Sequence, residues 1–167
     1  MKTNYTYPQN ISAVMQEAYT TKEFLPIVGL NENTFRQWSK RSITELQFPG
    51  TGHTAKFSGH EIVYIGALNV LSLLGFPPSK GKKGLKRNVL IFTDAFVRGT
   101  TTYKYCVAKS RKLGDEFLEW DLCQTITPAF HVVAANGGYV VPGGIYIDLL
   151  DLSEQIAKGL YEIFNSK

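Results

Sequence analysis

The feature that most constrains this chain is a pair of helix-start signals that lie close together near the N-terminus. Thr20 is followed three residues later by Glu23, a pattern in which a hydroxyl and a carboxylate satisfy the free amides at the start of a helix. The first helix is therefore predicted at 21–28, with Gly29 ending it. Asn31 then caps a second helix. Two short helices joined by so brief a glycine-containing turn are typical of a helix-turn-helix unit.

The second helix, predicted at 32–41, is amphipathic. At about 100° per residue, Phe35, Trp38 and Ser42 point to one side, which we expect to pack on the first helix through Phe24. The side chains on the opposite side are Arg36, Gln37, Lys40 and Arg41. Arginine, lysine and glutamine are side chains that contact base edges and phosphates in a DNA groove. An ordinary solvated face has a similar composition, so this pattern alone does not decide between the two interpretations.

A hairpin and a third helix are predicted next. Short β-favouring pieces at 46–48 and 55–57 flank a turn that contains two glycines. Ser58 and Glu61 repeat the helix-start pattern, and the apolar helix that follows ends at Gly75. The predicted order is therefore helix, turn, helix, hairpin, helix.

The basic residues are concentrated in the first half of the chain. Residues 1–87 contain 11 Lys and Arg against 5 Asp and Glu, whereas 88–167 contain 7 against 9. The segment 77–87 combines prolines, glycines and five cations, a composition that predicts a basic linker. Its lysines can either lie along a phosphate backbone or only keep a connector solvated. A basic half joined to a slightly acidic one favours a polyanion as the partner of the first half.

The second half predicts a small domain of mixed α and β structure. Residues 88–92 and parts of 131–149 are predicted as strands with glycine-rich turns. The segments 101–113 and 115–123 fit either a helix or a strand. An amphipathic helix at 151–164 closes the sequence.

Several other classes of function lack their motifs. Cys106 and Cys123 do not make a disulfide framework, and no CxxC or HxxxH pair supplies the spacing of metal ligands. The basic segment lacks the spacing of a phosphate-binding loop, so no cofactor is predicted. For catalysis, no spacing among Asp94, Asp121, Cys123 and His131 assembles a nucleophile with its base, so we do not expect an enzyme. The apolar stretches are too short for a membrane span and no signal peptide is recognised, so a cytoplasmic location is expected.

The first half of the chain resembles a known DNA-binding family. The stretches YTTKEFLPIVGLNENTFRQWSKR and FPGTGHTAKFSGHEIVYIGALNVLSLLGF are similar to the winged-helix domain of the MerR family and its phage relatives, which include excisionases and small terminase subunits. The matching residues are Tyr19 and Thr20, Gly29 and Leu30, Thr34, Phe35, Arg36 and Trp38, and Phe57, Ser58 and Glu61. The chain departs from the family at Ser42 and Ile43, where members carry Gly-Leu, and in the wing. It also lacks heptads after residue 76, so the family's metal or drug sensing is not expected.

The resemblance implies that the second helix and the wing contact double-stranded DNA. The residues that it assigns to this interface are Thr34, Arg36, Gln37, Lys40, Arg41, His53, Thr54 and Lys56. Arg36 and Gln37 are predicted to contact bases, and the cations Lys40, Arg41 and Lys56 are predicted to contact phosphates. Because one such domain holds few base pairs, a dimer on a repeated site is expected.

The whole sequence thus predicts an α+β chain. An N-terminal extension at 1–17 precedes a mostly helical winged helix-turn-helix domain at 18–76, and a C-terminal α+β domain at 88–167 serves self-association. The strands Tyr139–Val141 and Ile145–Leu149 and the last helix form either a two-fold interface or only the core of that domain. The predicted function is a sequence-specific transcriptional regulator of bacterial or phage type. The alternatives are an excisionase-like or small-terminase-like architectural protein, a ligand-sensing regulator, and a protein-interaction module that does not bind DNA.

Overall fold

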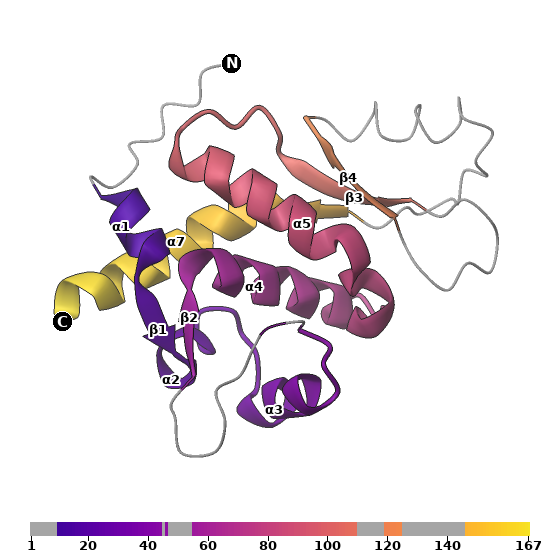
Figure 1. Cartoon of the computed structure of the whole chain (residues 1–167), viewed down its shortest axis with the longest axis horizontal. Coiled ribbons are helices and arrows are strands. Elements are labelled where there is room, and N and C mark those ends of the chain that lie inside the picture. Colours follow the sequence, from indigo (N-terminus) through magenta and orange to yellow (C-terminus); the bar gives the residue numbers. More distant parts are fainter. Residues whose placement is uncertain (1–9, 45, 47–54, 110–118, 125–145) are drawn as a thin grey trace.

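Helix α4 lies in the middle of the fold, and α1, α5 and α7 pack on it (Figure 1). The computed structural model describes residues 10–44, 46, 55–109, 119–124 and 146–167. In chain order, the elements are α1 (Ile11–Gln16), β1 (Ala18–Thr20), α2 (Thr21–Phe24), α3 (Glu32–Lys40), β2 (Lys56–Ser58), α4 (Gly59–Leu73), α5 (Pro78–Val97), β3 (Tyr105–Lys109), β4 (Glu119–Cys123), β5 (Tyr146–Asp148) and α7 (Leu149–Ser166). The architecture mixes helices with two small sheets, which confirms the predicted α+β class.

Helix α4 is buried on every side along its middle turns. All residues from Ile62 to Asn69 are buried. The helix starts with the predicted capping box, in which the Ser58 N–H donates to Glu61 Oε2 at 2.8 Å and the Ser58 hydroxyl accepts from the Glu61 N–H at 3.4 Å. Gly75 follows its end with a φ of 77°. Because α4 has no solvent face along these turns, it needs apolar neighbours in every direction.

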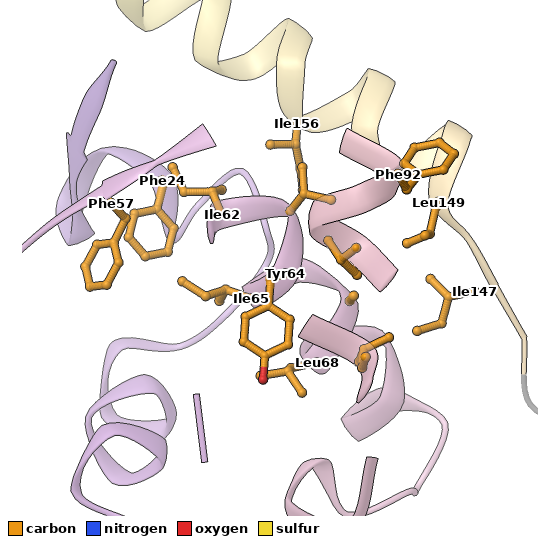
Figure 2. Close-up of a cluster of buried hydrophobic side chains, with 14 of the residues drawn as sticks. Phe24, Phe57, Ile62, Tyr64, Ile65, Leu68, Phe92, Ile147, Leu149 and Ile156 are labelled. Carbon is orange, nitrogen blue, oxygen red and sulfur yellow. The ribbon is translucent and has the colours of Figure 1, made fainter. Parts of the chain in front are cut away.

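The hydrophobic core draws side chains from both halves of the chain (Figure 2). Phe24 and Phe57 lie at one end of the cluster, and Ile147 and Leu149 lie at the other. Three residues of α1 also belong to this core, namely Ile11, Val14 and Met15. Part of the predicted N-terminal extension is therefore a packed helix, and the predicted division into halves does not coincide with a break in the core.

Helix α5 occupies the segment where a basic linker (77–87) and a strand (88–92) were expected, so both expectations are corrected. Pro78 lies in the first turn of α5, where the missing N–H removes no helical hydrogen bond. The buried apolar side chains described on α5 recur at helical spacing, and they are Leu85, Val89, Phe92 and Phe96. Their packing on α4 outweighs the low helix propensity of the proline and glycines around them.

The first sheet joins two segments that are distant in sequence. Strand β2 pairs antiparallel with β1, and Tyr19 lies opposite Phe57. The sequence predicted that 55–57 would pair with 46–48 in a hairpin. Of that predicted partner, Leu46 lies outside any strand and the rest is not described, and within the described residues β2 pairs with β1. Because Ala18 lies opposite Ser58, this pairing places the start of α4 beside the end of α1, and it places the start of α2 beside Lys56.

The second sheet is antiparallel, with β3 between β4 and β5. The two segments that fitted either a helix or a strand thus contain strands, and β5 falls within the predicted strand Ile145–Leu149. The strand predicted at Tyr139–Val141 lies outside the described residues. Helix α5 packs on this sheet, where the Asn88 side chain donates to the Trp120 carbonyl at 2.7 Å.

Helix α7 confirms the predicted closing helix. Asp148 caps its start by accepting a hydrogen bond from the Asp151 N–H at 3.0 Å. Ile156, Ala157 and Leu160 are buried, and the helix packs on α1 and α4. The apolar side of α7 is therefore used within the chain, which favours the interpretation of this helix as core over a two-fold interface.

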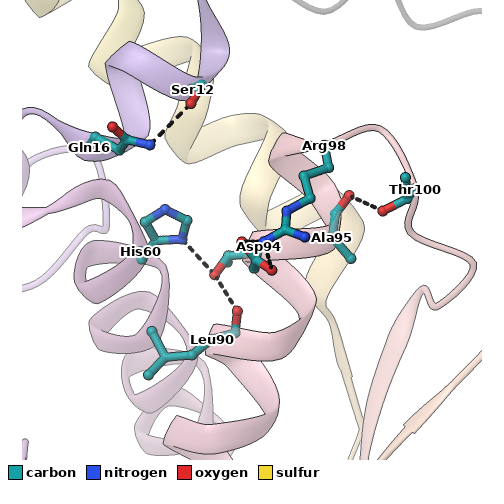
Figure 3. A network of polar contacts seen from close by, with 9 residues as sticks. Ser12, Gln16, His60, Leu90, Asp94, Ala95, Arg98 and Thr100 are labelled. Carbon is teal, nitrogen blue, oxygen red and sulfur yellow. Dashed lines mark hydrogen bonds and ion pairs between the residues drawn. The ribbon is translucent and has the colours of Figure 1, made fainter.

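A polar contact joins α4 to α5 inside the helical layer (Figure 3). The buried Thr93 hydroxyl lies 2.9 Å from His60 Nδ1 and 3.2 Å from the Leu90 carbonyl, to which it can donate. When it donates to this carbonyl, Nδ1 of His60 is the donor to the hydroxyl. Burial lowers the pKa of His60, and the nearby carboxylates of Asp94 and Glu61 partly oppose this effect. The imidazole is therefore neutral at neutral pH.

We expect acid to destabilise the fold through His60. Because its pKa in the folded protein lies below the ordinary value of 6.5, the neutral imidazole contributes stability that is present above pH 6.5 and is lost as the pH falls through the lower folded value. The Tm advantage of wild type over His60→Gln should therefore shrink between about pH 7 and pH 5. Thermal unfolding across this range measures the difference, and an advantage that stays constant would contradict a buried neutral His60.

Candidate nucleic-acid interface

The candidate interface is built on α3, and local side chains set where α2 and α3 begin. The Asn31 side chain accepts a hydrogen bond from the Asn33 N–H at 2.8 Å, which confirms it as the cap of α3. The predicted capping box of α2 is also present, with the Thr20 N–H donating to Glu23 Oε2 at 2.6 Å. Helix α2 is a single turn, shorter than predicted, because Pro26 has no N–H with which to continue the helix.

Three phenylalanines hold α3 against its neighbours. Phe24 from α2, Phe35 from α3 and Phe57 from β2 contact one another edge to face, with ring centroids 5.2 to 5.7 Å apart. All three rings are buried, and Trp38 is buried with them. The predicted packing of the aromatic side of α3 on the first helix is therefore confirmed. Since the rings come from three elements, their packing fixes the orientation of α3 relative to α2 and β2.

The opposite side of α3 is exposed, as predicted. Its exposed side chains include Arg36, Gln37 and Lys40, with Arg41 directly after the last turn. Thr34 is half-buried. Arg36 forms an ion pair with Glu32 at 2.7 Å, yet its side chain remains 68% exposed. Because a surface pair of this kind contributes at most about 1 kcal/mol, Arg36 can exchange Glu32 for another anion at little cost.

Helix α3 ends differently from the helical wheel, which placed Ser42 on the inward side. Ser42 has a φ of 51° and is exposed, whereas Ile43 turns inward and is buried. The Ser42 N–H donates to the Ser39 carbonyl at 3.0 Å, and the Ile43 N–H donates to the Trp38 carbonyl at 2.9 Å. This pair of bonds defines a helix end that favours glycine at the left-handed position, which Gly75 supplies after α4.

Cations from two other elements lie near α3. Lys56 is exposed on β2, directly before the Phe57 that contacts Phe35. Lys82, at the start of α5, donates through Nζ to the Ser42 carbonyl at 2.8 Å. The sequence indicated that 77–87 is basic, but nothing local in it specifies this long-range contact.

Two of the predicted interface residues, His53 and Thr54, lie outside the described residues. Of the other six, the structure brings five onto or directly beside α3 and places Lys56 on the adjacent strand. Contact of these residues with DNA stays a prediction.

The cysteines and the groups considered for catalysis have different surroundings. Burial raises the pKa of the Cys106 thiol, and the charges of Cys123 and Asp121 add to the effect, so this thiol stays protonated. Asp94 forms an ion pair within α5 on the exposed side of that helix, and His131 lies outside the described residues. No group of three or more His, Cys, Asp or Glu within the described part of the chain could hold a metal ion.

Comparison with known proteins leaves the family unassigned. No family model matches the chain, and no curated protein matches it significantly. No described helix combines the length and apolar character that a membrane span requires. The function is therefore inferred from the side chains of α3 and their surroundings.

The end of α3 provides a test of this geometry. Ser42→Gly should raise the free energy of unfolding by about 1 kcal/mol, because glycine adopts a positive φ without the steric cost that a side chain imposes. Ser39→Gly, which changes the same residue type within the helix, should instead lower stability by roughly 0.5–1 kcal/mol. Chemical denaturation of both variants measures the difference. Equal destabilisation by the two changes would contradict the helix end described here.

Proposed function

We propose that the protein binds double-stranded DNA in a sequence-specific way through α3 and acts as a transcriptional regulator of bacterial or phage type. The observation that carries this proposal is the two-sided character of α3. Its aromatic side is fixed by the phenylalanine cluster, so the exposed side is presented in one orientation. That exposed side carries Arg36, Gln37, Lys40 and Arg41 and no apolar side chain.

The proposed roles follow from the chemistry of these side chains. An α-helix fits the major groove, where the Arg36 guanidinium can bond a guanine edge with two N–H groups and the Gln37 amide can bond an adenine edge. In this arrangement Arg36 leaves Glu32, its ion-pair partner in the free protein. Thr34, near the start of α3, is assigned a contact through its hydroxyl with a phosphate or a base edge.

Phosphate contacts come from the cations that flank the reading residues. Lys40 and Arg41 lie at the end of α3, and Lys56 lies on the strand beside it. In the proposal, His53 and Thr54 extend this contact along the wing. Such contacts supply affinity and orientation without distinguishing bases, while α3 supplies the sequence preference.

The proposed regulator acts by occupancy as a pair of copies. A helix of this length contacts only a few base pairs, so a useful affinity requires two copies on a repeated site. The excess of cations over carboxylates in residues 1–87 favours this half as the DNA-binding part, and the slightly acidic remainder favours a role away from the phosphates. The proposed location is the cytoplasm, where the DNA of a bacterium lies.

The first experiment is selection from a random duplex DNA pool, with wild type and Arg36→Ala compared on the recovered sequences. We expect wild type to recover a repeated motif and Arg36→Ala to bind that motif roughly 10-fold or more weakly, because a bidentate base contact is worth about 1–3 kcal/mol. Lys158→Ala is the matched control, since Lys158 is also an exposed cation on a helix, but it lies on α7, outside α3. It should bind like wild type.

Three outcomes would contradict the proposal. They are the absence of any recovered motif, retention of the motif by Arg36→Ala, and an equal loss of binding in Lys158→Ala. Binding without sequence preference would instead favour the architectural alternative.

A second prediction separates phosphate contacts from base contacts. Lys40→Ala should weaken binding to all duplexes alike and reduce the steepness of the salt dependence by about one unit, because one fewer counterion is released. Titrations at several salt concentrations measure that slope for wild type and variant. An unchanged slope with an altered sequence preference would show that Lys40 reads a base rather than a phosphate.

A further inference from the structure

Helix α5 carries two exposed apolar side chains in the middle of its outer face. The exposed fractions are 36% for Leu90 and 46% for Ile91. Removing large aliphatic side chains from water is favourable, so two of them on adjacent exposed positions mark a surface that favours a partner.

The outer face of α5 is a continuous stripe opposite the core. At about 100° per residue, the exposed residues from Arg87 to Arg98 fall within roughly a third of the helix circumference, and the buried stripe lies on the other side. The residues on the outer stripe are Arg87, Leu90, Ile91, Asp94 and Arg98. The stripe begins after Gly84, whose φ of 81° interrupts the regular helix, so it lies on a single regular segment.

The charges on this stripe are complementary to a second copy of the same stripe. If two α5 helices pack antiparallel about a two-fold axis between positions 90 and 91, Leu90 of one copy faces Ile91 of the other. In the same register, Arg87 of each copy faces Asp94 of the other copy, which gives two such pairs. Asp94 already pairs with Arg98 at 2.9 Å, and its carboxylate has acceptor capacity for a second arginine.

We propose that the outer stripe of α5, defined by these five residues, is the interface through which two copies of this chain associate. The apolar pair forms its centre and the two Arg87–Asp94 pairs form its sides. The apolar side of α7 is filled by the chain's own core and leaves no comparable surface on that helix. This assignment does not depend on DNA binding, although it would supply the second copy that the proposed regulator needs.

The expected dimer is weak. A single pair of helices crossing through about three turns lies at the lower end of specific protein interfaces, so association in the micromolar range, with a Kd of about 20 μM or below, is expected. Two DNA sites at the matching spacing would strengthen the pairing, because binding of the second copy then becomes intramolecular.

Charge exchange across the axis gives a sharp test by sedimentation analysis of the full chain. Arg87→Glu places a second carboxylate opposite Asp94, and Asp94→Lys places a second cation opposite Arg87. Each variant alone should therefore self-associate roughly 10-fold or more weakly than wild type. An equal mixture of the two variants should associate again, because both cross pairs are then attractive. Measurements at about 50 mM salt limit screening of these exposed charges.

Two further variants test the apolar centre. Ile91→Glu should abolish the dimer, because it buries an unpaired charge at the axis. Leu73→Glu is the matched control, since Leu73 is a 78% exposed aliphatic residue at the end of α4, outside the stripe, and it should leave the dimer unchanged. Far-ultraviolet circular dichroism and the Tm of each variant show that a lost dimer does not reflect a lost fold.

The proposal is overturned if wild type is monomeric at about 200 μM, some 10-fold above the expected micromolar range, or if it remains a dimer in Ile91→Glu. It is also overturned if the mixture of charge variants associates no better than each variant alone. These results are obtained without DNA, so they are independent of the Arg36→Ala binding test. A dimer that forms as described with no DNA motif would refute the proposed function and leave this interface standing.

Discussion

Residues Ile62 to Asn69 of α4 are buried without interruption, and this burial sets the arrangement of the elements around them. An apolar helix without a solvent face requires partners on all sides, and here they come from α1, α5 and α7. Those partners belong to segments from residue 11 to residue 166. The two halves of the chain therefore share a core, although their compositions and charges differ.

The position of α3 depends on the same core indirectly, through β2. β2 leads directly into α4, and Phe57 of β2 contacts both Phe24 and Phe35. A displacement of α4 would therefore move the rings that orient α3. The buried residues of α3 are Phe35 and Trp38, so the other positions of this nine-residue helix can carry polar side chains.

Local signals in the sequence predicted the helix starts and the exposed face of α3. Thr20 with Glu23, Asn31, and Ser58 with Glu61 act on amides within three residues of themselves, so their effect can be read without the fold. The spacing of Phe35 and Trp38 likewise determined which side of α3 is buried and which side chains are exposed.

Features that depend on contacts between distant segments were missed. The prolines and glycines of 77–87 favoured the prediction of a linker, although Leu85 and Val89 have helical spacing. The short apolar run at 88–92 fits a strand as well as a helix. The pairing of β2 with β1 and the contact of Lys82 with the end of α3 join segments far apart in sequence. Such contacts are set by packing around α4, which no local pattern describes.

The most direct test of the central claim is to map the DNA-bound surface by amide chemical shifts of isotope-labelled protein, with the selected duplex added at low salt. We expect the largest shifts on α3, on Lys56 and at the start of α5, and little change in the sheet of β3, β4 and β5. Shifts concentrated on that sheet or on α7, or no shifts at all, would contradict α3 as the DNA-reading element.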